Sequence, residues 1–120
     1  MKGYQYLASP YSHPDATIRE ARYLEAVRAT ALLMNAGEII FSPIAHSHPI
    51  AVNHSLPLDW QFWEAYDRAF IQHCEGVIVL MLDGWRESKG VKAEIEIAKG
   101  LGWPVRYLTI DEKGALVWQT

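Results

Sequence analysis

The chain has 120 residues and a formal net charge of −3, with 50% hydrophobic and 21% charged residues. This length and composition predict one globular domain over residues 1–120 and exclude an intrinsically disordered chain. The negative net charge argues against nucleic acid or an anionic membrane as the main partner. A small anionic ligand stays compatible, because it needs only local hydrogen-bond donors.

The compartment is predicted from three further observations. No apolar run approaches the roughly 20 residues that span a bilayer, so we expect no membrane partner. The first residues lack the apolar core of a signal peptide. The single cysteine, Cys74, cannot form an internal disulfide, which favours a reducing compartment. We therefore expect a cytoplasmic protein.

Strand and helix patterns alternate along the chain, beginning with a short strand over residues 4–8. Pro10 ends this strand, because proline interrupts a central ladder. Asp15 is a suitable N-cap for a long helix that runs to about residue 36. We expect this helix to bury the apolar side chains that recur at helical spacing, namely Ala21, Leu24, Val27, Ala31 and Met34.

A second strand is predicted over residues 38–41, and residues 44–57 follow it. This segment is rich in histidine and proline and shows no periodicity, so we expect a long loop of the kind that is often functional. Asp59 then caps a helix over residues 60–74. One carboxylate, Asp67, falls on the apolar face of that helix, which is marked by Trp63, Tyr66, Phe70 and Cys74.

The apolar run over residues 76–82 predicts a fully buried strand. A helix follows it and runs to about residue 101. Glu94 lies in the middle of the apolar stripe that this helix should bury, whereas Glu96 points to another side. Charged side chains are rarely buried without a reason, so Glu94 is a candidate for function.

Residues 103–108 predict a further strand, and residues 115–118 either add a last strand or only pack. The order of elements predicts a mainly parallel sheet of four to five strands with helices on both faces. In such open sheets the ligand lies beyond the C-terminal ends of the strands. Three loops meet there, at residues 9–11, 43–48 and 83–88, and we expect them to form one cleft.

Two carboxylates on neighbouring helix stripes, Asp67 and Glu94, together with Asp83 at a strand end, favour a chemical role. Each carboxylate alone could equally be a structural group that accepts hydrogen bonds. Together, carboxylates in different environments can act as nucleophile and general acid. Ser88 and Gly90 at the helix start could hold a phosphate, although Ser88 could also be an ordinary N-cap. Neither a Walker-type loop nor a dinucleotide-binding fingerprint is present, which disfavours an NTPase and a dinucleotide-dependent enzyme.

The histidines of the predicted loop present an alternative. His46 and His48 could lie on one side of an extended segment, and with His54 and Asp59 they could bind a metal ion. No His-x-x-x-His pair or cysteine ligand supports such a site, so we expect neither a metal nor a cofactor. The aromatic side chains of residues 60–66 exceed what a small core needs, and could stack on a base or contact another subunit.

Two motifs resemble those of a known family. The segment Tyr6-Leu-Ala-Ser-Pro-Tyr11 resembles the opening strand and loop of the nucleoside 2-deoxyribosyltransferase superfamily. The pattern Ser88-x-Gly90-Val91-x-x-Glu94 is similar to that of its nucleoside 5′-monophosphate N-glycosidase branch. With Gly84-Trp85 before it, this second motif is still closer to small members of the superfamily. The resemblance spans about residues 4–108 and implies a single domain of this type.

The resemblance implies a Rossmann-like, flavodoxin-type three-layer α/β/α sandwich that cleaves the N-glycosidic bond of a nucleoside 5′-monophosphate or nucleoside. Glu94 would be the nucleophile that attacks C1′ of the sugar, and Asp67 would orient the sugar or Glu94. Asp83 would protonate or bind the leaving base. Ser88 would hold the 5′-phosphate at the helix N-terminus.

The two motifs and the predicted cleft add further residues that we expect to bind the substrate. By the resemblance, the ribose and base would be lined by Tyr6, Ala8 and Tyr11. The remaining expected residues are Ser9, His46, Gly84, Trp85 and Gly90. Ser9 stands where the family usually has glycine, and His46 lies outside the family pattern. These two departures bear on which substrate is bound more than on the fold.

Hydrolysis is favoured over glycosyl transfer, because the Ser88 pattern follows the hydrolase branch. Family members act as dimers or larger assemblies, so the resemblance implies a homodimer or homotetramer. A non-catalytic nucleotide-binding or sensor domain of the same fold is the alternative function. A third reading, a receiver domain with Asp83 as phosphoacceptor, lacks the clustered acids and the late lysine that receivers need.

Overall fold

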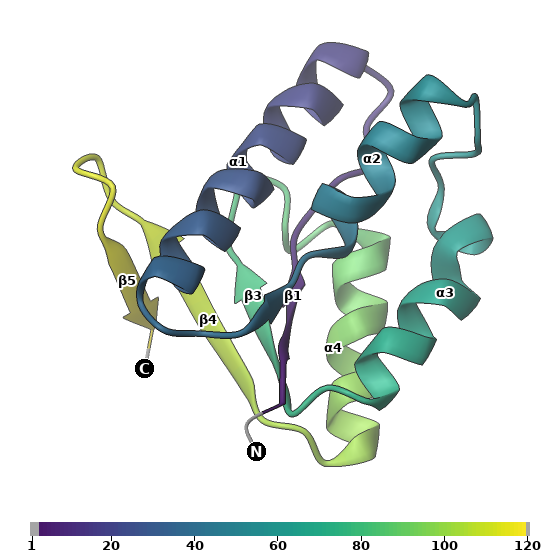
Figure 1. The fold of residues 1–120 in the computed structure, drawn as a ribbon. Helices are drawn as coiled ribbons and strands as arrows, with labels where there is room; N and C mark the ends of the chain where they lie inside the picture. The colour runs from purple at the N-terminus through teal and green to yellow at the C-terminus, as the bar shows by residue number, and fades with distance from the viewer. Residues whose placement is uncertain (1–2, 120) are drawn as a thin grey trace.

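A mainly parallel sheet forms the centre of the protein, which a computed structural model describes over residues 3–119 (Figure 1). Within these residues the sheet has five strands in the order β2-β1-β3-β4-β5. The first four strands in the chain run parallel, and β5 runs antiparallel to β4. Their bounds are β1 Gln5–Ala8, β2 Ile40–Phe41, β3 Gly76–Leu80, β4 Val105–Ile110 and β5 Leu116–Gln119. The predicted α/β class is confirmed.

A polar N-cap residue precedes each of the helices between the strands. These helices are α1 Ala16–Asn35, α2 Pro43–Asn53, α3 Trp60–Gln72 and α4 Lys89–Leu101. The side chains of Asp15, Ser42 and Ser88 each accept a hydrogen bond from an amide in the first turn. Gly102 ends α4 with a φ of 79°, a left-handed conformation that glycine adopts without strain. Across residues 3–119, no helix has both the length and the apolar character needed to cross a membrane.

The prediction of a long loop over residues 44–57 is wrong, because most of this segment forms α2. The Ser42 hydroxyl accepts a hydrogen bond from the amide of Ala45 at 3.2 Å. Pro43 occupies the first turn, where its fixed φ suits a helix and no backbone donor is needed. The second strand is also shorter than predicted, since only residues 40 and 41 pair with β1. Serine and proline at this boundary therefore start a helix soon after the strand.

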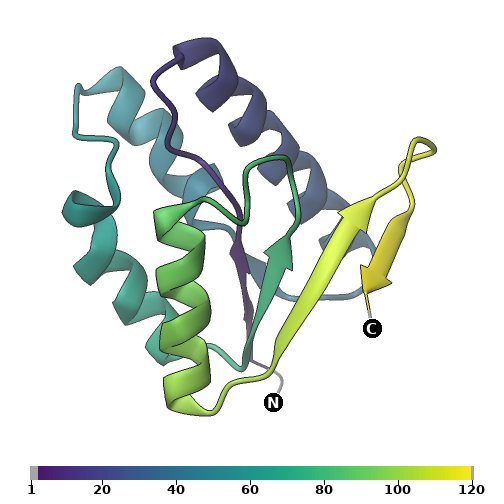
Figure 2. The same cartoon turned by 180° about the vertical axis from the view of Figure 1, so that it is seen from behind.

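Two clusters of buried apolar side chains pack against the central strands, because successive residues of a strand point to opposite faces. Tyr6 and Ala8 belong to a cluster that includes buried side chains of α3 and α4. Leu7 belongs to a second cluster, which includes Ala29 and Leu33 of α1. In the view from behind, α4 lies in front of the strands (Figure 2). The core thus ties β1 to three helices.

Helix α1 buries a different stripe from the predicted one, so that prediction is wrong. Leu24 and Met34 of the predicted stripe are each 55% exposed. The buried side chains are Ala26, Ala29, Thr30 and Leu33. Alanine allows the helix backbone to come close to the sheet, and the Thr30 hydroxyl donates a hydrogen bond to the Ala26 carbonyl at 2.7 Å. Close packing of the helix against the sheet therefore outweighs the burial of the larger apolar side chains.

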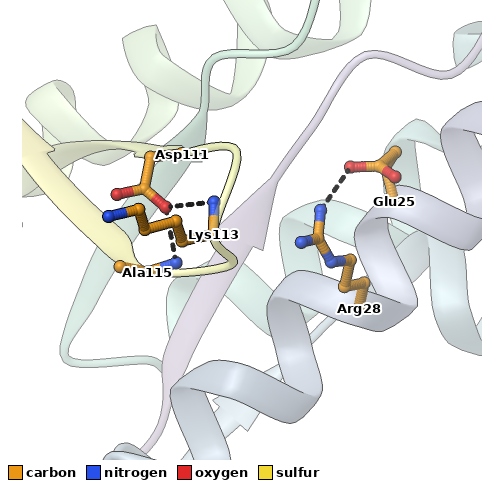
Figure 3. Close-up of polar contacts among 5 residues, drawn as sticks. All are labelled: Glu25, Arg28, Asp111, Lys113 and Ala115. Atoms are coloured by element: carbon orange, nitrogen blue, oxygen red, sulfur yellow. Dashed lines mark hydrogen bonds and ion pairs between the residues drawn. The ribbon is translucent and has the colours of Figure 1, made fainter.

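An aspartate turn joins β4 to β5 (Figure 3). The Oδ1 atom of Asp111 accepts hydrogen bonds from the amides of Lys113 and Ala115, both at 2.9 Å. This turn brings the last strand back beside β4. Figure 3 also shows Arg28 and Glu25 of α1, whose charged atoms are 3.7 Å apart. Both side chains are exposed, so the pair contributes little to stability.

We expect Ala29→Leu to lower the free energy of unfolding by about 1–3 kcal/mol, because added atoms at a fully buried position strain the packing against the sheet. The matched change Ala31→Leu lies on the exposed side of α1 and should alter it by less than about 0.5 kcal/mol. Urea denaturation of both variants measures the two effects. Equal effects would contradict the observed orientation of α1.

Candidate functional site

A cavity of about 410 Å³ lies between the loop after β1, helices α2 and α3, and the first turn of α4. The loop, α2 and α4 follow the C-terminal ends of β1, β2 and β3, which is the edge where open α/β sheets hold ligands. Of the residues expected in the site, those that line the cavity are Ser9, Tyr11, Asp67, Ser88, Gly90 and Glu94.

Glu94 lies on the cavity-facing side of α4 and is only 5% exposed. Its Oε2 atom accepts a hydrogen bond from the hydroxyl of Tyr6, a fully buried residue of β1. Glu96, two residues further along the same helix, is exposed. The predicted difference between the two glutamates is confirmed, because α4 has one apolar stripe and Glu94 lies within it.

Asp67 brings a second carboxyl group to the same place from α3, and it is 8% exposed. Burial raises its pKa from 3.8 to about 7, and the Tyr6 hydroxyl opposes this rise. Burial raises the pKa of Glu94 well above its usual value, and the negative charge of Asp67 raises it further. The hydrogen bond from Tyr6 acts in the opposite direction and favours the Glu94 carboxylate.

The three groups are therefore coupled, because ionising both carboxyl groups would place two negative charges in a buried site. Burial and the two carboxylates raise the pKa of Tyr6, so its hydroxyl keeps the proton that it donates to Glu94. Burial and the charge of Asp67 favour a proton on Glu94, whereas the hydrogen bond from Tyr6 favours the Glu94 carboxylate, so the pair favours one proton shared between two carboxyl groups. Such a pair can supply a nucleophile and a neutral hydrogen-bonding partner in one cavity.

Three buried polar atoms at the cavity have no hydrogen-bond partner within the described part of the chain. They are Ser9 Oγ, Ser47 Oγ and Asp67 Oδ1, and all three residues line the cavity. A buried polar group without a partner costs free energy, and native proteins contain few of them. Their gathering at one cavity suits a ligand rich in hydroxyl groups. Ser47 was not predicted, because its segment has no periodicity in the sequence.

The first turn of α4 presents amide donors to the cavity. Ser88 Oγ accepts a hydrogen bond from the amide of Val91 at 3.2 Å, and Ser88 O accepts the amide of Lys92 at 3.1 Å. The amides of Lys89 and Gly90 precede this first helical hydrogen bond, and both residues line the cavity. Free amides and the helix dipole together favour an anionic group at this end.

His48 links the cavity to α1, and sequence reasoning assigned it no role beyond the metal alternative. Its Nδ1 atom is 2.6 Å from the hydroxyl oxygen of Tyr11, and its Nε2 atom is 2.6 Å from Oε2 of Glu20. The ring of Tyr23 stacks on the imidazole with 4.3 Å between ring centroids. The contact needs α2 to lie beside α1, so no local sequence signal could have indicated it.

Other expected site residues lie outside the cavity lining. Asp83 is exposed, and its carbonyl oxygen accepts a hydrogen bond from Arg22 at 3.3 Å. Gly84 follows it with a φ of 90°, and Trp85 packs against Tyr107 with 5.7 Å between ring centroids. The roles expected for these three consecutive residues stay predictions.

Two further expected residues lie near the cavity without lining it. Ala8 is fully buried in β1, beneath the loop that carries Ser9. His46 is exposed and stacks on Tyr66, with 5.7 Å between ring centroids. The histidines therefore point to different neighbours. Residues 3–119 contain no group of three or more histidine, cysteine, aspartate or glutamate side chains placed to hold a metal ion.

Residues 3–109 match the model of a protein family described as "Domain of unknown function (DUF1937)". The matched segment contains β1 to β3, all four helices that the structure describes, and nearly all of β4. It therefore includes every residue that lines the cavity. No curated protein matches the chain.

We expect Asp67→Asn to stabilise the fold increasingly as the pH rises. The pKa of Asp67 is higher in the folded protein than the usual 3.8. The folded state therefore binds the proton more tightly, and its stability falls between about pH 4 and about pH 7. Asparagine cannot ionise, so the gain over the parent should grow by about 2 kcal/mol between about pH 5 and about pH 8 in urea denaturation.

Glu64→Gln is a matched control on the same helix, because Glu64 is partly exposed and paired with Arg68. This variant should show no comparable gain at higher pH. If Asp67→Asn gains no more stability at the higher pH than the control does, Asp67 does not carry the raised pKa.

Proposed function

This chain belongs to the DUF1937 family, and we propose that it cleaves the N-glycosidic bond of a nucleoside 5′-monophosphate or nucleoside. The observation that carries this proposal is the buried Glu94 carboxylate, held by Tyr6 beside Asp67 in a cavity of about 410 Å³. The motifs around Tyr6 and Glu94 also resemble those of nucleoside 2-deoxyribosyltransferase-like enzymes. Hydrolysis is the favoured outcome, and transfer of the (deoxy)ribosyl group is the alternative chemistry.

In the proposed reaction, a carboxylate oxygen of Glu94 attacks C1′ of the sugar. The C1′–N bond breaks through a transition state with oxocarbenium character, and a glycosyl ester of Glu94 forms. Water then attacks C1′ and releases Glu94, while the water proton passes to a base. The buried Tyr6 hydroxyl holds Glu94 in place for both steps. The unpartnered Oδ1 of Asp67 is suited to accept a hydrogen bond from a sugar hydroxyl.

The rest of the cavity offers partners for the other parts of a nucleotide. The amides of Lys89 and Gly90, with the Ser88 hydroxyl, would bind the 5′-phosphate at the helix N-terminus. Trp60 and Trp63 also line the cavity, and their rings would stack on the base. A phosphate, a sugar and a base thus each have a matching surface.

A non-catalytic nucleotide-binding or sensor domain is the second candidate. It is favoured by the raised pKa of Glu94, because a protonated carboxyl group cannot act as a nucleophile. The hydrogen bond from Tyr6 favours the Glu94 carboxylate, and the motifs around both residues resemble those of enzymes, so we favour the enzyme. Turnover separates the two functions, since both include nucleotide binding.

The remaining proposals concern the fold family, the assembly and the location of the protein. A flavodoxin-type three-layer sandwich fits the two clusters of buried side chains that pack against β1. A homodimer or homotetramer fits the large apolar side chains exposed on α1 and α3, such as Leu24, Met34 and Phe62. A cytoplasmic location fits the single, buried Cys74.

We expect Glu94→Gln to reduce the release of free base by roughly a thousandfold or more, because glutamine keeps the Tyr6 hydrogen bond but is not a nucleophile. Glu96→Gln is the matched control on the same helix and should keep parental activity, since Glu96 is exposed. Chromatography of a panel of ribo- and deoxyribonucleoside monophosphates and nucleosides measures free base.

Two results would count against the enzyme. One is that no member of the panel yields free base, and the other is that Glu94→Gln is as active as the parent. Calorimetric binding of a nucleotide without turnover would instead support the sensor.

Ser88→Asp should weaken the binding of monophosphates, because it places a negative charge beside the expected phosphate. Aspartate caps a helix as well as serine does, so the start of α4 should be retained. We expect KM to rise about tenfold or more for monophosphates and to change little for nucleosides. Ser88→Asn, a neutral cap, is the control. An unchanged KM for monophosphates in Ser88→Asp would show that the phosphate binds elsewhere.

A further inference from the structure

The proposed cleavage needs an acid for the departing base, because most bases leave poorly as anions. Asp83, to which the sequence resemblance assigns this role, is exposed and lies outside the cavity lining. Glu94 is the nucleophile, and Asp67 is its buried neighbour. Asp59, Glu87 and Lys89 also line the cavity, but they are exposed. Among the described residues, the other lining side chains that titrate and are hydrogen-bonded to one another are Tyr11 and His48.

This network runs in one line through three segments of the chain. Tyr11 comes from the loop after β1, His48 from α2 and Glu20 from α1. The two contacts of the imidazole, to Tyr11 and to Glu20, are both 2.6 Å. The Glu20 carboxylate can only accept, so Nε2–H donates to it and fixes the orientation of the ring. The Nδ1 atom is then left to exchange a proton with the Tyr11 hydroxyl.

The two charged partners in this network differ in burial, since His48 is buried and Glu20 is exposed. His48 is 7% exposed, and the ring of Tyr23 stacks on one face of its imidazole. The Glu20 side chain is 55% exposed at the other end. The imidazole is therefore held in place, while the carboxylate that pairs with it reaches water.

We propose that Tyr11 is the general acid and base of the reaction, with His48 as the proton donor behind it and Glu20 as the positioning residue. This inference rests on the glycosidase function proposed above. As the C1′–N bond breaks, the Tyr11 hydroxyl gives its proton to the ring nitrogen of the leaving base. The Nδ1 proton of the His48 imidazolium moves to the tyrosine oxygen. His48 becomes neutral, and the electron pair of the broken bond stays on the base.

The second half of the reaction runs the same path in reverse. Water attacks C1′ of the Glu94 ester and loses a proton to the Tyr11 oxygen, as the Tyr11 proton returns to Nδ1 of His48. The C1′–O bond to Glu94 breaks, and its electron pair restores the carboxylate. Glu20 stabilises the imidazolium that forms, as the carboxylate of a catalytic triad does. The proton taken in the first step is regained in the second.

A structural reading of the same contacts is that they only hold α2 against α1. The two readings differ in their dependence on the leaving group. An acid matters when the leaving group needs a proton, and matters little when the leaving group departs as a stable anion. A structural tether, by contrast, affects every substrate in the same way.

The test therefore compares two substrates with one sugar. One is the monophosphate that releases base fastest, and the other is the 4-nitrophenyl glycoside of the same sugar 5-phosphate, whose leaving group departs without protonation. We expect Tyr11→Phe to lower kcat/KM, which reports formation of the Glu94 ester, by roughly 10²–10⁴-fold for the nucleotide and by less than about tenfold for the nitrophenyl glycoside. Hydrolysis of the ester is common to both substrates, so a slower second step lowers kcat for both. Glu94→Gln should lose both activities.

Glu20→Gln is a second test variant. It should disturb the fold less than Tyr11→Phe does, because the Glu20 side chain is half exposed. We expect the same direction of effect as in Tyr11→Phe, but a smaller one. His54→Gln, an exposed histidine at the end of α2, is the matched control and should behave like the parent. Thermal unfolding of each variant checks that the fold is kept.

Three results would overturn the inference, and they separate it from the proposed function. Equal losses of kcat/KM on the two substrates in Tyr11→Phe and Glu20→Gln would show that the network is a tether. Full activity of Tyr11→Phe on the nucleotide would show that another group is the acid. In both cases the glycosidase would stand. Absence of base release from every substrate by the parent protein would overturn the function and the relay together.

Discussion

The hydrogen bond from Tyr6 to Glu94 is the contact on which the site depends. It joins β1 to α4 across 88 positions of sequence, at a point where both residues are almost completely buried. A buried carboxylate without such a donor would cost several kcal/mol or remain protonated. Because Tyr6 also belongs to the core cluster against α3 and α4, the sheet itself holds the donor in place. The Glu94 carboxyl group is therefore positioned by the sheet and its core.

The sequence predicts a helix face well when the helix has one apolar stripe. On α4 a single stripe contains Glu94, so periodicity is enough to place that carboxylate inside. On α1 the sequence offers two stripes, and hydrophobicity alone favours Leu24 and Met34, which are exposed. What decides between them is how closely the backbone can approach the sheet. That depends on the alanines at positions 26 and 29, and on packing that no local pattern records.

The network of Tyr11, His48 and Glu20 could not be predicted for a related reason. Its members are 9, 28 and 37 positions apart, and they meet only because α2 packs beside α1. Prolines in the segment favour a loop when they are read one by one, although Pro43 suits the first turn of a helix. Sequence reasoning found Asp67, Ser88 and Glu94, each placed by a single helix. It also found Ser9 and Tyr11, which follow the end of a strand. It missed the link from Tyr11 to His48 and Glu20, because only the contact between α1 and α2 forms it.

The two edges of the sheet restrict how copies of this protein could associate. The strand at one edge, β2, pairs over only two residues before α2 begins. At the other edge β5 has four residues, and the guanidinium of Arg106 lies over the ring of Trp118 at 4.6 Å. Short edges and a nearby cation disfavour the addition of a further strand from another chain. Association through a continuous intermolecular sheet is therefore disfavoured.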